Sequence, residues 1–89
     1  MSRIFKDSKT NLYVYIYTND HQPARVHIFC NPKRSNRQPG IKISIGSETQ
    51  RPTIVMKHPS ITNKDAIAAL KLVAEHQQEF LERWHEIHG

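Results

Sequence analysis

The first half of the chain alternates between apolar and polar residues with a period of two. In residues 12–18, aliphatic side chains alternate with Tyr13, Tyr15 and Tyr17, and residues 25–31 repeat the pattern. Such alternation of β-branched and aromatic residues is typical of strands. The stretch NDHQPA between the two segments contains Asn, Asp and Pro, which favour turns. We therefore predict a β-hairpin whose loop is longer than two residues.

Further segments downstream and upstream continue this pattern. Residues 41–46 alternate isoleucine with polar side chains, and residues 53–57 are rich in β-branched side chains. Residues 3–5 can add a short edge strand. Residues 31–40 show no periodicity and are rich in Pro, Asn, Ser and basic residues, which predicts an irregular connection.

The period changes to that of a helix in the last third of the chain. Thr62 with Asp65 three residues later resembles a capping box, and apolar residues then recur in one stripe. A helix of about 26 residues would span about 39 Å, whereas a strand of five to seven residues spans only about 17–24 Å. We therefore expect the helix either to overhang the sheet or to break near EHQQE. We expect Phe80, Trp84 and Ile87 to belong to the core.

These elements predict an α+β fold in a single domain over residues 1–89. The expected architecture has two layers, with an antiparallel sheet of four to five strands packed on one long C-terminal helix. Residues 1–60 form the basic sheet and residues 61–89 the amphipathic helix. A chain of 89 residues forms only a modest core, which argues against a buried catalytic centre of many parts.

The distribution of charge indicates the kind of partner to expect, and the cysteine content indicates the location of the protein. Residues 1–60 hold ten lysines and arginines against three acidic residues, while residues 61–89 hold three against five. Such asymmetry favours a polyanionic or acidic partner. The single Cys30 permits no internal disulfide, and no apolar run is long enough to span a membrane. We therefore expect a cytoplasmic protein without a membrane association.

The sheet face opposite the helix combines aromatic and basic side chains. It is predicted to hold Tyr13, Tyr15, Tyr17, Arg25, His27, Phe29 and Lys42, and the adjoining connection adds Lys33, Arg34 and Arg37. Rings interleaved with cations are typical of surfaces that stack bases and bind phosphates. Tyrosine is equally enriched at protein interfaces, so a homodimer or another protein partner covering this face is the alternative.

The sequence supports catalysis or metal binding by the histidines less strongly than it supports a binding face. His27 beside Arg25 can serve a nuclease-like reaction, but the sequence fixes no second carboxylate or histidine near it, which favours a half-exposed histidine without catalytic function. A metal site would need His21, His27 and either His58 or Cys30 to converge, and no tight ligand spacing is present. We therefore predict neither a bound metal nor a cofactor.

Several of these residues resemble a bacterial family known as domain of unknown function 4160. The resemblance rests on HQP followed by VHI in residues 13–28, and on a helix ending in FLERWHEIHG in residues 66–89. Asp20, Pro23 and the VHI stretch match the family pattern of an acidic turn, two prolines and a His-x-His pair. Ala24 stands where the second proline would be and Arg25 where the first histidine would be.

The resemblance implies a small cytoplasmic protein, often encoded beside another small protein as in toxin–antitoxin modules. Together with the charge split, it leads to the hypothesis of a binding protein of toxin–antitoxin-like or regulatory type. Its partner would be a protein, with RNA or DNA as a further ligand. The alternatives are a metal-independent nuclease-like enzyme that uses His27 and Arg25, and a structural subunit of a larger complex.

Overall fold

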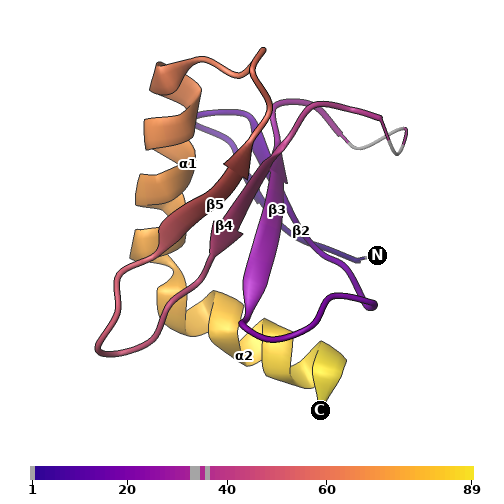
Figure 1. Cartoon of the computed structure of the whole chain (residues 1–89), viewed down its shortest axis with the longest axis vertical. Helices are drawn as coiled ribbons and strands as arrows, with labels where there is room; N and C mark the ends of the chain where they lie inside the picture. The colour runs from indigo at the N-terminus through magenta and orange to yellow at the C-terminus, as the bar shows by residue number, and fades with distance from the viewer. Residues whose placement is uncertain (1, 33–34, 36) are drawn as a thin grey trace.

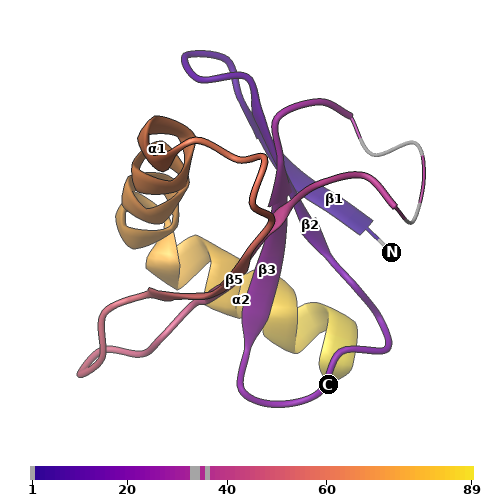
Figure 2. The ribbon, with the colours of Figure 1, turned by 45° about the horizontal axis from the view of Figure 1, so that its top comes forward.

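The fold is built on a five-stranded antiparallel sheet in which each strand pairs with its neighbours in the chain. A computed structural model of the protein describes residues 2–32, 35 and 37–89. The chain order of the strands is also their order in the sheet: β1 (Ser2–Asp7), β2 (Leu12–Ile16), β3 (Arg25–Phe29), β4 (Ile41–Ser44) and β5 (Thr53–Lys57). Figure 1 shows β2 to β5 in this order, and Figure 2 shows β1 next to β2. The α+β class, the antiparallel sheet and the predicted hairpin are confirmed. β1 is longer than the expected edge strand.

The C-terminal helical segment is confirmed and is divided into two helices. α1 (Asn63–Glu75) begins after Thr62. The Thr62 hydroxyl accepts a hydrogen bond from the Asp65 backbone N–H at 3.1 Å, as the capping pattern predicts. The segment breaks at His76, inside the EHQQE stretch, and α2 (Gln77–His88) continues in a new direction. Figures 1 and 2 show α2 turning across the end of the sheet instead of extending beyond it.

The break follows from the lengths of the elements and from one side chain. The 13 residues of α1 span about 20 Å, which matches the strands. Directly after the break, the Gln77 amide Nε2 donates to the carbonyl oxygens of Ile45 at 2.9 Å and Gln50 at 3.0 Å. Gln77 is the polar residue at the centre of the apolar stripe, and it joins the start of α2 to the β4–β5 connection.

The core lies between one sheet face and the two helices. The inward residues of β2, β3 and β4 are almost completely buried, as their alternation predicts. From α2, Phe80 and Trp84 are 0% and 1% exposed, while Ile87 packs against the core and is partly buried. The Phe5 ring on β1 contacts the Phe80 ring edge-on at 5.7 Å. The change of direction at His76 therefore buries the side chains that a straight helix would have left without cover.

A candidate binding face with a histidine–aspartate pair

The sheet surface opposite the helices, here called the outer face, carries one continuous row of side chains. Strand register pairs residues across all five strands in the order Arg3, Tyr15, His27, Lys42 and Met56. Directly opposed side chains in an antiparallel sheet lie about 5 Å apart at Cβ. A second row joins Lys6, Tyr13 and Phe29. The sequence-predicted members on the strands therefore do share one face.

Two of the predicted aromatic residues are not open to a ligand. Tyr15 is 6% exposed and Phe29 is 4% exposed, and their rings meet edge-on at 5.6 Å. The backbone of Gly40 lies over the Phe29 ring so closely that a Cβ added there would be 2.5 Å from a ring carbon. The outer face therefore differs from the open stacking surface that the sequence predicts, because its own chain covers these two rings.

The other two tyrosines already contact side chains of this face. The Tyr17 ring is stacked on the His27 imidazole, with 3.9 Å between ring centroids and 7° between their planes. The Tyr13 ring lies 5.6 Å from the guanidinium of Arg3 and 5.6 Å from the ammonium of Lys6. Such cation–π contacts position basic groups over a ring and leave them charged. Tyr13 therefore positions two of the basic groups of the outer face, and Tyr17 positions His27.

His27 is paired with Asp20, a carboxylate that the sequence pattern does not place near it. The imidazole Nε2 and the Asp20 Oδ2 are 2.7 Å apart, and the two side chains are only 12% and 14% exposed. The expectation of a half-exposed histidine with no carboxylate fixed nearby was wrong. Asp20 lies in the β2–β3 loop, and periodicity gives no information about the direction in which a loop side chain points.

Opposing effects act on the protonation of His27. Burial lowers the pKa of His27 below its usual value of 6.5, the Asp20 hydrogen bond and charge raise it, and the charges of Lys42 and Arg25 lower it. Because the net direction is downward, the imidazole is neutral at neutral pH. An ionised carboxylate can only accept, so Nε2–H donates to Asp20 and Nδ1 carries the basic lone pair. This arrangement orients a histidine that can accept a proton.

The outer face also carries unneutralised positive charge. Arg25 donates from Nε to the Pro23 carbonyl oxygen at 3.3 Å, and within the described residues none of Arg3, Lys6, Arg25 and Lys42 forms an ion pair. Arg37 is exposed on the connection between β3 and β4. The predicted contributions of Lys33 and Arg34 lie outside the described residues.

A shallow hollow of about 220 Å³ opens on the outer face beside His27. Lys42 and Met56 line it from β4 and β5, Tyr17 lines it from the β2–β3 loop, and Gln38 and Gly40 line it from the connection that covers Phe29. The hollow is smaller than the sites that enclose a drug-sized ligand. Its size and its lysine suit one carboxylate or phosphate group of a larger partner.

In the part of the chain that the structure describes, no three or more His, Cys, Asp or Glu side chains come together as metal ligands would. Cys30 points away from His27, and its thiol donates to the Asp65 carboxylate at 3.7 Å. Among those same residues, no helix has both the length and the apolar character needed to cross a membrane.

The fold and the outer face define a small α+β protein in which an antiparallel meander has helices on one side and basic residues on the other. Comparison with protein families assigns the chain to one family within this class. Residues 11–85 match the family described as Domain of unknown function (DUF4160), and the chain belongs to that family. The resemblance stated from the HQP, VHI and C-terminal helix residues is therefore confirmed. Searches of curated proteins and of solved structures gave no match.

Proposed function

We propose that this protein is a small binding protein of regulatory or toxin–antitoxin-like type, which engages an acidic surface of a protein partner through its outer face. The observation that carries the proposal is the set of four basic side chains, Arg3, Lys6, Arg25 and Lys42, that share this face without an ion-pair partner among the described residues. Clustered, unneutralised cations attract acidic groups and steer their approach.

The packing of the rings favours carboxylates over nucleobases as the groups recognised. Base stacking needs an accessible ring face, whereas Tyr15 and Phe29 are buried and Tyr17 is stacked on His27. The basic groups remain able to contact anions from the side. The phosphates of RNA or DNA are the other anions that this face fits, and the experiment below distinguishes them from acidic protein.

The test compares charge removal on the outer face with charge removal elsewhere. The double variant Arg25→Gln and Lys42→Gln is measured against the control Lys9→Gln and Lys64→Gln, whose lysines are exposed on the β1–β2 turn and on α1. The probes are poly-glutamate and single-stranded RNA, followed by fluorescence anisotropy at about 20 mM and about 200 mM salt. We expect poly-glutamate to bind the wild type and the control more tightly than the outer-face variant.

Three results would contradict this proposal. Equal loss in both double variants would show that net charge alone drives binding. Tighter binding of RNA, with a salt slope that falls by about 0.7 for each phosphate contact removed, would assign the face to nucleic acid. A homodimer in solution that the outer-face variant dissociates would show that a second copy covers this face.

A second candidate function is metal-independent cleavage of RNA, and the 2.7 Å contact between His27 and Asp20 favours it. In this reaction Nδ1 of His27 removes the proton from a ribose 2′-hydroxyl, and the 2′-oxygen attacks phosphorus. The bond to the 5′-oxygen breaks, that oxygen takes a proton from water, and a 2′,3′-cyclic phosphate forms. Arg25 would stabilise the charge that develops on the phosphate oxygens.

The enzyme hypothesis is tested with purified protein and a fluorescent RNA substrate. His27→Ala should abolish cleavage, and Asp20→Asn should reduce it because the imidazole loses the carboxylate that orients it. Activity that survives His27→Ala, or that is absent from the wild type, would reject this candidate. Neither result would affect binding of poly-glutamate by the wild type.

A further inference from the structure

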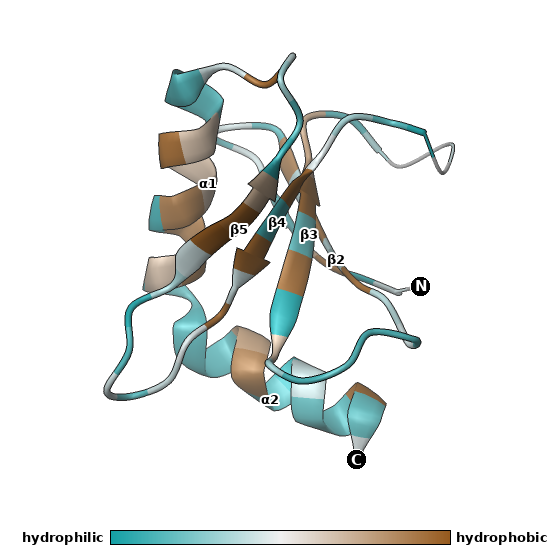
Figure 3. Ribbon diagram, in the orientation of Figure 1, coloured by the Kyte–Doolittle hydropathy of each residue, from teal (hydrophilic) through white to brown (hydrophobic). Residues whose placement is uncertain are grey.

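A second surface, which meets the outer face at Met56, lies along the free edge of β5. Four large hydrophobic side chains are exposed in the described part of the chain, and three of them are consecutive on this strand. Ile54, Val55 and Met56 are 40%, 54% and 58% exposed. Figure 3 shows this apolar segment on the strand at the edge of the sheet. Soluble proteins seldom leave an apolar edge strand uncovered, because its backbone groups can pair with another strand.

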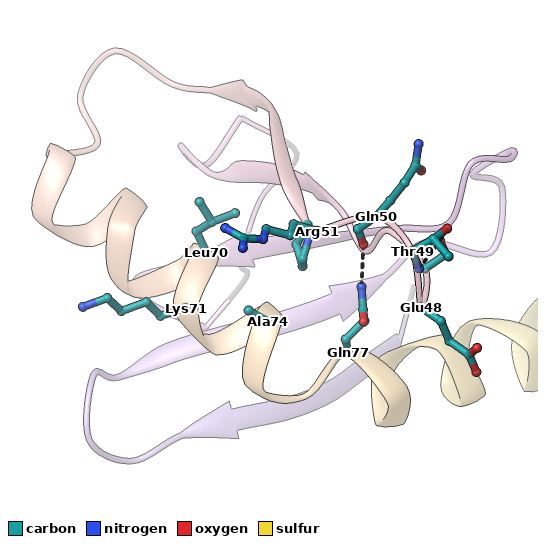
Figure 4. A pocket seen from close by; sticks show the side chains of 10 residues that line it. Glu48, Thr49, Gln50, Arg51, Leu70, Lys71, Ala74 and Gln77 are labelled. Carbon is teal, nitrogen blue, oxygen red and sulfur yellow. Dashed lines mark hydrogen bonds between the residues drawn. The ribbon is translucent and has the colours of Figure 1, made fainter.

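A groove of mixed apolar and polar character lies next to the start of β5. It lies between the β4–β5 connection and α1 and has a volume of about 600 Å³, and its lining combines the apolar side chains of Pro52, Leu70 and Ala74 with polar and charged ones. Figure 4 shows Arg51 directed from the connection toward Leu70, and Gln77 at the end of the groove with its hydrogen bond to Gln50. A strand added at β5 would therefore have the apolar side chains of Pro52, Leu70 and Ala74 near it where β5 begins.

The charges around the edge indicate what kind of strand it accepts. Arg51 and Lys71 line the groove, and neither forms an ion pair with another described residue. Lys57 ends the strand, and Glu48 is the only carboxylate among the residues that line the groove. Basic groups that flank an apolar edge complement a segment that alternates apolar and acidic residues.

The same charges argue against a second copy as the occupant. An antiparallel pairing of two β5 strands centred on Val55 would place Lys57 of one copy opposite Thr53 and diagonal to Arg51 of the other. It would also bring together two chains that each carry a net charge of +5.

We propose that the β5 edge is a docking site for an extended, acidic segment of another protein, which adds to the sheet as a sixth strand next to β5. The backbone of the segment would pair with β5, its apolar side chains would cover Ile54 and Leu70, and its carboxylates would face Arg51 and Lys71. Met56 belongs to both surfaces, but none of the unpaired cations of the outer face contributes to this site.

The experiment uses a peptide of about ten residues in which valine alternates with glutamate, long enough to cover one strand. Val55→Lys blocks the edge with a charge, and Ile67→Lys is its matched control, because Ile67 on α1 is 55% exposed and Val55 is 54% exposed. We expect the wild type and Ile67→Lys to bind the peptide equally, and Val55→Lys to bind it at least about tenfold more weakly. Amide hydrogen exchange in residues 53–57 should slow when the peptide binds.

A scrambled peptide of the same composition, without the alternation, controls for charge and should not slow exchange in β5. Absence of binding to the wild type, or equal weakening by the two lysine substitutions, would overturn the proposal. So would a wild-type dimer that only Val55→Lys dissociates, because the occupant would then be a second copy. The cations of the outer face are intact in every variant, so failure here is distinguishable from failure of the proposed function.

Discussion

At the scale of single residues, His27 is held by contacts of two kinds. Tyr17 stacks on one face of its ring, and Asp20 accepts its Nε2–H in the plane of the ring. Together these contacts fix both the orientation and the tautomer of the imidazole. The nearby charges of Arg25 and Lys42 then act on a ring that has little freedom to move away.

The first prediction concerns the protonation of this ring. Because the Asp20 charge raises the pKa of His27 and the Arg25 charge lowers it, Asp20→Asn should lower that pKa further and Arg25→Gln should raise it. The measurement is an NMR titration of the His27 imidazole in the three proteins. Shifts in the same direction for both variants would show that the substitutions act through a change in structure.

The second prediction concerns stability and pH. The folded-state pKa of His27 lies below its usual value of 6.5, so the unfolded chain binds this proton more readily. The stabilising contribution of neutral His27 to the free energy of unfolding is therefore fully present above about pH 6.5, and it is lost as the pH falls toward the folded-state pKa. The free energy of unfolding in urea is measured at about pH 7 and about pH 5 for both proteins. The decrease between the two pH values should be smaller for His27→Gln than for the wild type. Identical pH dependence in the two proteins would contradict it.

At the scale of secondary-structure elements, the helix break at His76 depends on the side chain that follows it. Gln77 satisfies the carbonyl oxygens of Ile45 and Gln50, two acceptors contributed by the β4–β5 connection. One amide group therefore connects the start of α2 to the β4–β5 connection at the point where the chain changes direction.

The third prediction compares two adjacent glutamines. Gln77→Ala should lower the free energy of unfolding by about 1–3 kcal/mol, because the Ile45 carbonyl oxygen loses its side-chain donor. The Gln50 carbonyl oxygen keeps the Ser47 backbone N–H at 3.0 Å. Gln78→Ala should change it by less than about 0.5 kcal/mol, because Gln78 is exposed and its amide reaches only Glu82, at 3.3 Å. Chemical denaturation gives both values. Equal costs for the two substitutions would show that the junction does not depend on Gln77.

Strands and core could be predicted from the sequence, whereas the site could be predicted only in part. The alternation that places Val26 and Ile28 inward also places His27 and Phe29 outward, because side-chain direction in a strand follows period two. The Asp20 contact and the cover that Gly40 gives Phe29 come from loops. Loop direction depends on tertiary contacts, which a local pattern does not contain.

At the scale of the whole molecule, stability depends on one core shared by the sheet and both helices. Trp84 and Phe80 are its largest fully buried side chains, and both come from α2. A domain of this size has a free energy of unfolding of about 5–15 kcal/mol, so the loss of one large core side chain is felt throughout the fold.

The fourth prediction tests this dependence. Trp84→Ala should lower the free energy of unfolding by about 3–5 kcal/mol because it leaves a large cavity. Arg83→Ala should change it by about 0.5 kcal/mol or less, because the Arg83 side chain is 44% exposed and lies 3.8 Å from Glu86 in a surface ion pair. Circular dichroism follows the helices and the NMR signals of β3 follow the sheet, and both should give the same denaturation midpoint. Loss of α2 while the sheet stays folded would contradict a shared core.

The strand order also has a consequence for synthesis. Each strand pairs only with its chain neighbours, so the sheet can form hairpin by hairpin as the polypeptide is made. The helices that cover its apolar side follow β5 in the chain and end at residue 88. At typical rates of translation this stretch takes roughly two to six seconds to complete, and the nascent sheet remains uncovered for that time. The growing chain should therefore be most open to chaperone binding and to aggregation after β5 has been made and before α2 is complete.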